Sequence, residues 1–149
     1  MSAEGIKRRL AGQETDMCTS EPLPIHISRP QSHDRVMEYL RSVGSIEAFE
    51  QGLVEVKFSP VDNRVLFYTN NRTGAVGRAL DRRKPKWKAF GDTSGLFTVG
   101  SGRTAVVVED AASACAMGVF TECSGCALLG TSISTVQRHQ LLTFDTVII

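Results

Sequence analysis

The sequence predicts an α/β fold, in which a helical and antiparallel basic subdomain (residues 31–102) precedes part of a parallel sheet (residues 103–149). Two patterns predict this order. Residues 53–58 and 65–68 are strand-like runs separated by a turn-rich stretch, which favours a β-hairpin. Short apolar runs then alternate with helical segments toward the carboxyl end, which is typical of a parallel unit. Residues 1–30 have three prolines and little periodicity, and they predict a flexible leader.

The first subdomain is expected to begin with helices. Residues 32–43 place apolar side chains at helical spacing after a serine that can cap the helix, and Gly44 follows as a stop signal. Residues 46–51 predict a second short helix. After the hairpin, residues 75–80 predict a third antiparallel strand. Residues 92–102, which contain three glycines, are expected to form a flexible connector without the spacing of a phosphate-binding loop.

The second subdomain is organised around residues 105–108, an apolar β-branched run that predicts a buried strand. A helix of small residues follows this strand. A second strand is then predicted at 127–130, a helix at 134–142 and a third strand at 144–149. Because the sequence stops inside this last apolar run, we expect the chain to be a fragment or an early-terminated product.

Two consecutive carboxylates, Glu109 and Asp110, follow the central strand. Open α/β sheets bind their ligands at the carboxyl ends of their strands. The position makes Glu109 the candidate catalytic residue, with Asp110 as its neighbour in a possible metal site. Asp145 is predicted to lie at the opposite end of the sheet.

Charge is strongly segregated, although the net charge is only +1. Residues 72–88 contain seven Lys or Arg and one acid, whereas the remainder has ten basic and fifteen acidic residues. Binding to phosphate depends on such local charge. Cations interleaved with aromatic rings suit a single-stranded template, since rings stack on unpaired bases. An equally weighted alternative is a solvated basic loop with Trp87 in the core. The candidate nucleic-acid or nucleotide ligands are Arg78, Arg82, Arg83, Lys84, Lys86, Lys88 and Trp87.

The cysteines do not predict a disulfide scaffold or a metal site. Cys123 and Cys126 have CxxC spacing, but no second pair or nearby histidine completes four ligands, so no zinc is expected. We predict small buried or half-buried thiols; a zinc or redox site remains a minor alternative. Apolar runs reach four or five residues, against about twenty for a membrane span. These features predict no membrane partner and a reducing, cytoplasmic location.

The segments GRALDRRKPKWKAFG, VVVED, ALLGTS and FDTVII occur in an order that resembles phage-type DNA primases with a Toprim domain. The resemblance covers roughly residues 32–149. It implies a Toprim-like (Rossmann-like) sheet in the second subdomain. It also implies a nucleotidyltransferase that makes RNA primers on single-stranded DNA from ribonucleoside triphosphates with Mg²⁺. The setting would be phage DNA replication in the cytoplasm of an infected or prophage-bearing bacterium, with a replicative helicase as a possible partner.

The resemblance assigns roles to a few residues. Glu109 matches the family glutamate, while Asp110 and Ser113 stand where that family has glycine and aspartate. The family's magnesium-binding Asp-x-Asp pair would follow residues 144–149, where the sequence ends, so we expect this chain alone to be inactive and to hold Mg²⁺ weakly. The alternative function is a non-catalytic single-stranded nucleic-acid-binding or regulatory module.

Overall fold

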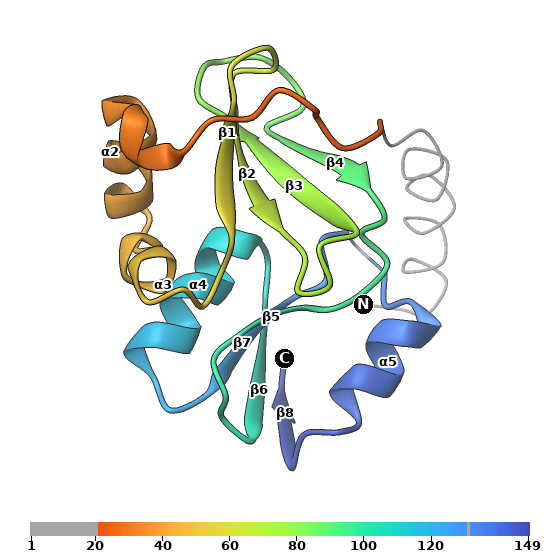
Figure 1. The fold of residues 1–149 in the computed structure, drawn as a ribbon. Coiled ribbons are helices and arrows are strands. Elements are labelled where there is room, and N and C mark those ends of the chain that lie inside the picture. Colours follow the sequence, from red (N-terminus) through yellow and green to blue (C-terminus); the bar gives the residue numbers. More distant parts are fainter. Residues whose placement is uncertain (1–20, 131) are drawn as a thin grey trace.

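The computed structural model describes residues 21–130 and 132–149, and it contains two four-stranded sheets (Figure 1). The first sheet is antiparallel, in the order β1 (Val56–Ser59), β2 (Arg64–Tyr68), β3 (Gly74–Ala79), β4 (Trp87–Gly91). The second has the order β5 (Phe97–Val99), β7 (Ser124–Ala127), β6 (Thr104–Val108), β8 (Thr146–Ile148). Strand β6 is parallel to both of its neighbours, and β5 is antiparallel to β7. The predicted α/β class is confirmed, and the second sheet is mixed.

Helices pack around these sheets, and Figure 1 shows α2 and α3 beside β1, with α4 between them and the second sheet. Their bounds are η1 (Pro30–Ser32), α2 (Asp34–Ser42), α3 (Ile46–Glu50), α4 (Ala111–Phe120) and α5 (Thr135–Leu141). One continuous core contains Leu40 of α2, Phe67 of β2, Val99 of β5 and Cys115 of α4. The two predicted subdomains are therefore joined by a shared apolar core. No helix among the described residues is long and apolar enough to cross a membrane.

Several predicted elements are present with shifted bounds. The hairpin, the third antiparallel strand and both N-terminal helices form where they were expected. The first helix begins at Asp34, so its N-cap is His33, which makes no side-chain capping bond, and the predicted cap Ser32 belongs to η1 instead. The last helix is capped by Ser134, whose hydroxyl accepts from the amide of Gln137 while the Gln137 side chain accepts from the amide of Ser134. Gln137 is buried, and its side-chain amide also donates to Leu128 O at 2.6 Å.

Three strands differ from the prediction. The basic segment ends in strand β4, and the expected flexible connector contains β5. The second parallel strand is Ser124–Ala127 rather than 127–130, since the chain turns at Leu129 with φ of 59°. Small residues such as Gly125 gave no β-branched signal. They form a strand because α4 packs directly against their backbone, and a Cβ at Gly125 would overlap the carbonyl oxygen of Ala114.

Residues 21–30, which we assigned to the leader, lie across the antiparallel sheet (Figure 1). Glu21 pairs with Phe90 on one edge strand, and Ser28 exchanges two backbone hydrogen bonds with Phe58 on the other. Between them, Leu23 packs on the sheet face opposite the helices. The segment therefore covers both edges and one face of this sheet. The remainder of the predicted leader, residues 1–20, lies outside the described residues, as does Cys18.

Candidate nucleic-acid interface

The connection between β3 and β4, residues 80–86, contains four of the seven cations of residues 72–88, and we call it the basic loop. Arg82, Lys84 and Lys86 are exposed there. Within residues 21–130 and 132–149, none of the three side chains has an acidic partner. The one acid of this connection, Asp81, pairs with Arg83. The three remaining cations therefore give a local positive potential that attracts phosphate.

A buried arginine holds this loop in place. Arg64, at the start of β2, is 3% exposed, and its guanidinium donates to Gly77 O at 2.9 Å and Pro85 O at 2.7 Å. Burial lowers the pKa of Arg64, and the nearby Arg83 lowers it further. Buried donors of this kind fix carbonyl groups that would otherwise lack partners. Arg64 is thus a positioning residue for the loop, and the sequence signalled it only as one more cation.

Arg83 is committed to structure rather than free for a ligand. Its guanidinium lies 2.9 Å from Asp81 Oδ2 and donates to Asp62 O at 2.7 Å. Asp81 also accepts from Asn63 Nδ2 at 3.0 Å. Hydrogen bonds from Arg83, and then from Asn63, hold the pKa of Asp81 well below its usual range. This cluster joins the β1–β2 turn to the basic loop.

Trp87 and Lys88 do not extend the exposed surface of the basic loop. The indole of Trp87 packs against the core, with its ring centroid 5.7 Å from that of Phe67. Lys88 lies on the opposite face of β4, where its ammonium is 2.6 Å from Glu21 Oε1 and 5.4 Å from the Phe90 ring centroid. The structure therefore favours the alternative in which Trp87 belongs to the core.

Arg78 lies on β3 in a groove of about 330 Å³ between this sheet and α2. Its guanidinium is 5.8 Å from the centroid of the Tyr39 ring. Burial raises the pKa of Tyr39 to about 12; Arg78 opposes this rise, and the carboxylate of Asp110 adds to it. The Tyr39 hydroxyl thus interacts electrostatically with Arg78 of the first sheet and with Asp110, which follows strand β6 of the second. This brings together two regions that the sequence treated as separate.

The two carboxylates lie at the carboxyl end of β6, as predicted, but they differ in role. Asp110 is the N-cap of α4, and its Oδ1 accepts from Ser113 N at 2.8 Å. Glu109 is exposed. Asp145 lies at the other end of the sheet, where it pairs with Arg103 at 3.0 Å. Among the described residues, no group of three or more His, Cys, Asp or Glu side chains could hold a metal ion.

The described cysteines are free thiols, and the prediction of buried or half-buried thiols is confirmed for them. Cys115 and Cys126 are buried and Cys123 is half-buried. Burial raises the pKa of the Cys115 thiol to about 12, and it also raises the pKa of Cys126. Protonated thiols of this kind are poor nucleophiles and poor metal ligands.

Comparison with known proteins gives one structural similarity. No protein-family model matches the sequence, and no curated protein matches it. A solved structure described as the structure of the DnaG catalytic core is similar, with 18% sequence identity and a TM-score of 0.48. The match covers 86% of this chain and 46% of that chain. The chain therefore spans less than half the length of that structure.

Proposed function

We propose that this chain is a primase-like protein whose basic loop binds single-stranded DNA. The observation that carries the proposal is the set of exposed cations Arg82, Lys84 and Lys86, which have no acidic partner in the described part of the chain. Neutralising phosphates with such cations releases counterions, which drives association. The template would continue along the groove that contains Arg78.

The anchoring of the loop supports binding over a merely solvated turn. Arg64 ties the loop carbonyls to the sheet, and Arg83 and Asp81 tie it to the neighbouring turn. A loop fixed in this way loses less conformational entropy when it meets a ligand. The bases of the bound DNA would not stack on Trp87, because its indole ring packs in the core.

Primer synthesis is the finer proposal, and it comes from the resemblance of the sequence to phage-type primases. In that proposal Glu109 acts on the reacting nucleotide, ribonucleoside triphosphates are the substrates and a replicative helicase is a possible partner. The carboxylates present fit Mg²⁺ poorly, because Asp110 already caps a helix and only Glu109 stands free beside it. We therefore propose template binding as the activity of this chain, with primer synthesis as the activity of the class it resembles.

The second candidate is a non-catalytic single-stranded nucleic-acid-binding or regulatory module. The capping role of Asp110 favours it, because this role accounts for the carboxylate without any chemistry. Both candidates use the basic loop in the same way. They differ only in whether Glu109 contributes to a reaction.

A salt series with fluorescent single-stranded DNA tests template binding. The variant R82A/K84A/K86A is compared with R29A/R41A/R138A, which removes three exposed cations elsewhere. Each lost phosphate contact should reduce the slope of log affinity against log salt by about 0.7 for single strands. We expect a reduction of about 2 in the first variant and little change in the control. Equal slopes in both variants would contradict the proposal.

A second assay separates the two candidates. Template-dependent synthesis of an oligoribonucleotide is measured with Mg²⁺ for the chain and for Glu109→Gln. The replacement keeps the size of the side chain and removes its charge. Synthesis that is lost in the variant, with DNA binding retained, would support an enzyme. Absence of synthesis in both, with DNA binding retained, would support the non-catalytic module.

A further inference from the structure

Residues 21–30, which cross the antiparallel sheet, form a segment that we call the strap (Figure 1). Its two ends are held by isolated bridges, one to each edge strand of the sheet. Pro22 and Pro24 have no backbone N–H, so the strap does not continue from these bridges into a ladder with either strand. Ile25, between the bridges, is exposed. The strap is therefore fixed at its ends, and its amino-terminal end places one acidic side chain, Glu21, on strand β4.

The Glu21 carboxylate covers a cation of β4. Its Oε1 lies 2.6 Å from the Lys88 ammonium, and the side chains of Lys88 and Glu21 are 28% and 54% exposed. Water screens an ion pair of this exposure, so the pair contributes little to stability. The strap does not depend on it for attachment, because the Gly91 amide donates to Glu21 O at 2.8 Å. Another anion can therefore replace the Glu21 carboxylate while the strap stays on the sheet.

Lys88 follows directly on the free cations of the basic loop. Lys86, two residues earlier, is exposed, and its carbonyl accepts from Ala79 N at 3.0 Å, so the pairing of β4 with β3 continues through it. Because successive side chains of a strand point to opposite faces, Lys86 and Lys88 share one face while Trp87 packs in the core. Two residues advance a strand by about 7 Å. Without the Glu21 carboxylate, the cationic surface would therefore extend from the basic loop onto β4.

We propose that the strap is an autoinhibitory device in which Glu21 withholds Lys88 from single-stranded DNA. The inference rests on the proposed function of the basic loop, and it adds a means of regulating that site. A phosphate of the bound strand competes with the Glu21 carboxylate for the Lys88 ammonium. Since the strap holds Glu21 beside Lys88, the carboxylate competes at a high effective concentration. Affinity for DNA is lowered by the free energy needed to displace it.

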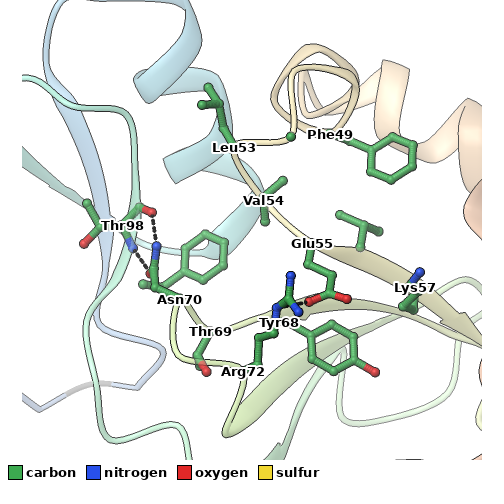
Figure 2. A pocket seen from close by; sticks show the side chains of 13 residues that line it. Phe49, Leu53, Val54, Glu55, Lys57, Tyr68, Thr69, Asn70, Arg72 and Thr98 are labelled. Carbon is green, nitrogen blue, oxygen red and sulfur yellow. Dashed lines mark hydrogen bonds and ion pairs between the residues drawn. The ribbon is translucent and has the colours of Figure 1, made fainter.

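A second ion pair of the same sheet provides a matched control. Figure 2 shows Glu55 and Arg72, whose Oε2 and Nε atoms are 2.8 Å apart. Arg72 lies in the β2–β3 turn, whereas the basic loop joins β3 to β4, so the two lie at opposite ends of β3. The Arg72 side chain is 74% exposed. Glu55→Gln therefore changes the net charge as Glu21→Gln does, but it frees a cation at the end of the sheet away from the basic loop.

The affinity of the full chain for a short fluorescent single-stranded DNA at low salt tests the proposal. Glu21→Gln should bind about threefold more tightly than the unmodified chain, because one exposed ion pair no longer competes. Glu55→Gln should bind as the unmodified chain does. Equal affinity of all three proteins, or an equal gain in both variants, would overturn the autoinhibition and leave template binding by the basic loop intact. Absence of DNA binding in all three would overturn the proposed function and this inference with it.

Two further measurements test whether Lys88 is the cation that Glu21 withholds. In a chain that carries Lys88→Ala, the replacement Glu21→Gln should no longer raise the affinity for DNA, because the ammonium for which the two anions compete is gone. Labelling with an amine-reactive reagent, read by mass spectrometry, gives the second readout, since bound DNA should protect Lys88 in the Glu21→Gln variant. A gain in affinity that persists without Lys88, or a Lys88 that stays equally reactive when DNA is bound, would overturn the inference.

Discussion

The two sheets are packed by different means. The antiparallel sheet buries large side chains on both faces, including Phe67, Leu66 and Phe90, and residues 21–30 cover its edges. In the second sheet, strand β7 is built from small residues, and α4 approaches it so closely that Gly125 has no room for a Cβ. One edge strand of this sheet, β8, is exposed. The other edge strand, β5, is covered in part by Asn70 of the β2–β3 turn, whose side-chain amide hydrogen-bonds to the backbone of Thr98.

This difference in packing explains where charged side chains lie in each of the two sheets. The antiparallel sheet is packed with large side chains, and Arg64 is buried within it. From this position Arg64 donates a hydrogen bond to Pro85 O of the basic loop. The second sheet depends on close backbone contact between β7 and α4, and it carries Glu109 exposed at the end of β6. Substitutions in the second sheet can therefore alter stability without removing a residue of the basic loop.

The largest expected effect concerns the backbone contact of the second sheet. Gly125→Ala should lower the free energy of unfolding by about 3 kcal/mol, because the new methyl group overlaps the Ala114 carbonyl. Urea denaturation measures it. Gly95→Ala is the matched control, since nothing lies within 4 Å of a Cβ there. Similar stability of the two variants would contradict close packing of α4 on β7.

The next effect tests the support beneath the basic loop. Arg64→Ala should cost about 2 kcal/mol, because it removes the hydrogen bonds of a buried guanidinium to Gly77 O and Pro85 O. Affinity for single-stranded DNA should fall with it. Arg82→Ala, an exposed cation of the same loop, should weaken DNA binding with stability unchanged. An Arg64→Ala variant with normal stability and normal DNA binding would contradict the positioning role.

The contact between the sheets should have a smaller effect. Asn70→Ala removes two hydrogen bonds to the backbone of Thr98 and should cost about 1.5 kcal/mol. It also opens the edge of β5, which favours association between chains. Thermal unfolding and sedimentation measure both effects, with Asn70→Asp retaining only the acceptor. Unchanged stability would show that the two sheets are held together by the core alone.

Replacing Asp110 and replacing Glu109 should have different effects on the free energy of unfolding. Asp110→Ala should cost about 1 kcal/mol through loss of the N-cap of α4. Glu109→Ala should leave stability within about 0.5 kcal/mol, since its side chain is exposed. Urea denaturation of both variants measures the two losses of stability. The reverse order of costs would assign the structural role to Glu109.

The last effect appears only at alkaline pH, where stability should fall. The folded chain raises the pKa of Cys115 from 9.0 to about 12, so the unfolded state loses this proton first. Stability from this group is complete below pH 9 and falls as pH rises toward 12. Cys115→Ala should make the decline shallower. Tyr39, with a pKa of about 12, contributes to the same decline.

The sequence was a good guide where the signal is local. The hairpin, the first two helices and the carboxylates after β6 follow from periodicity and from turn residues, and they are present. Strand β7 was displaced by three residues in the prediction, because Ser124 and Gly125 carry no intrinsic β preference. Their conformation is set by the helix that packs on them.

For the candidate interface, the sequence by itself determined the local charge. Seven cations and one acid within residues 72–88 are a property of composition. The fold adds acidic partners from elsewhere for two of these cations, Glu55 for Arg72 and Glu21 for Lys88. Only the tertiary structure decided which cations are free. Strand pairing sends Trp87 and Lys88 to opposite faces, burial turns Arg64 into a support, and Asp81 binds Arg83. These roles depend on residues distant in sequence, whose separations become short only when the sheets pack.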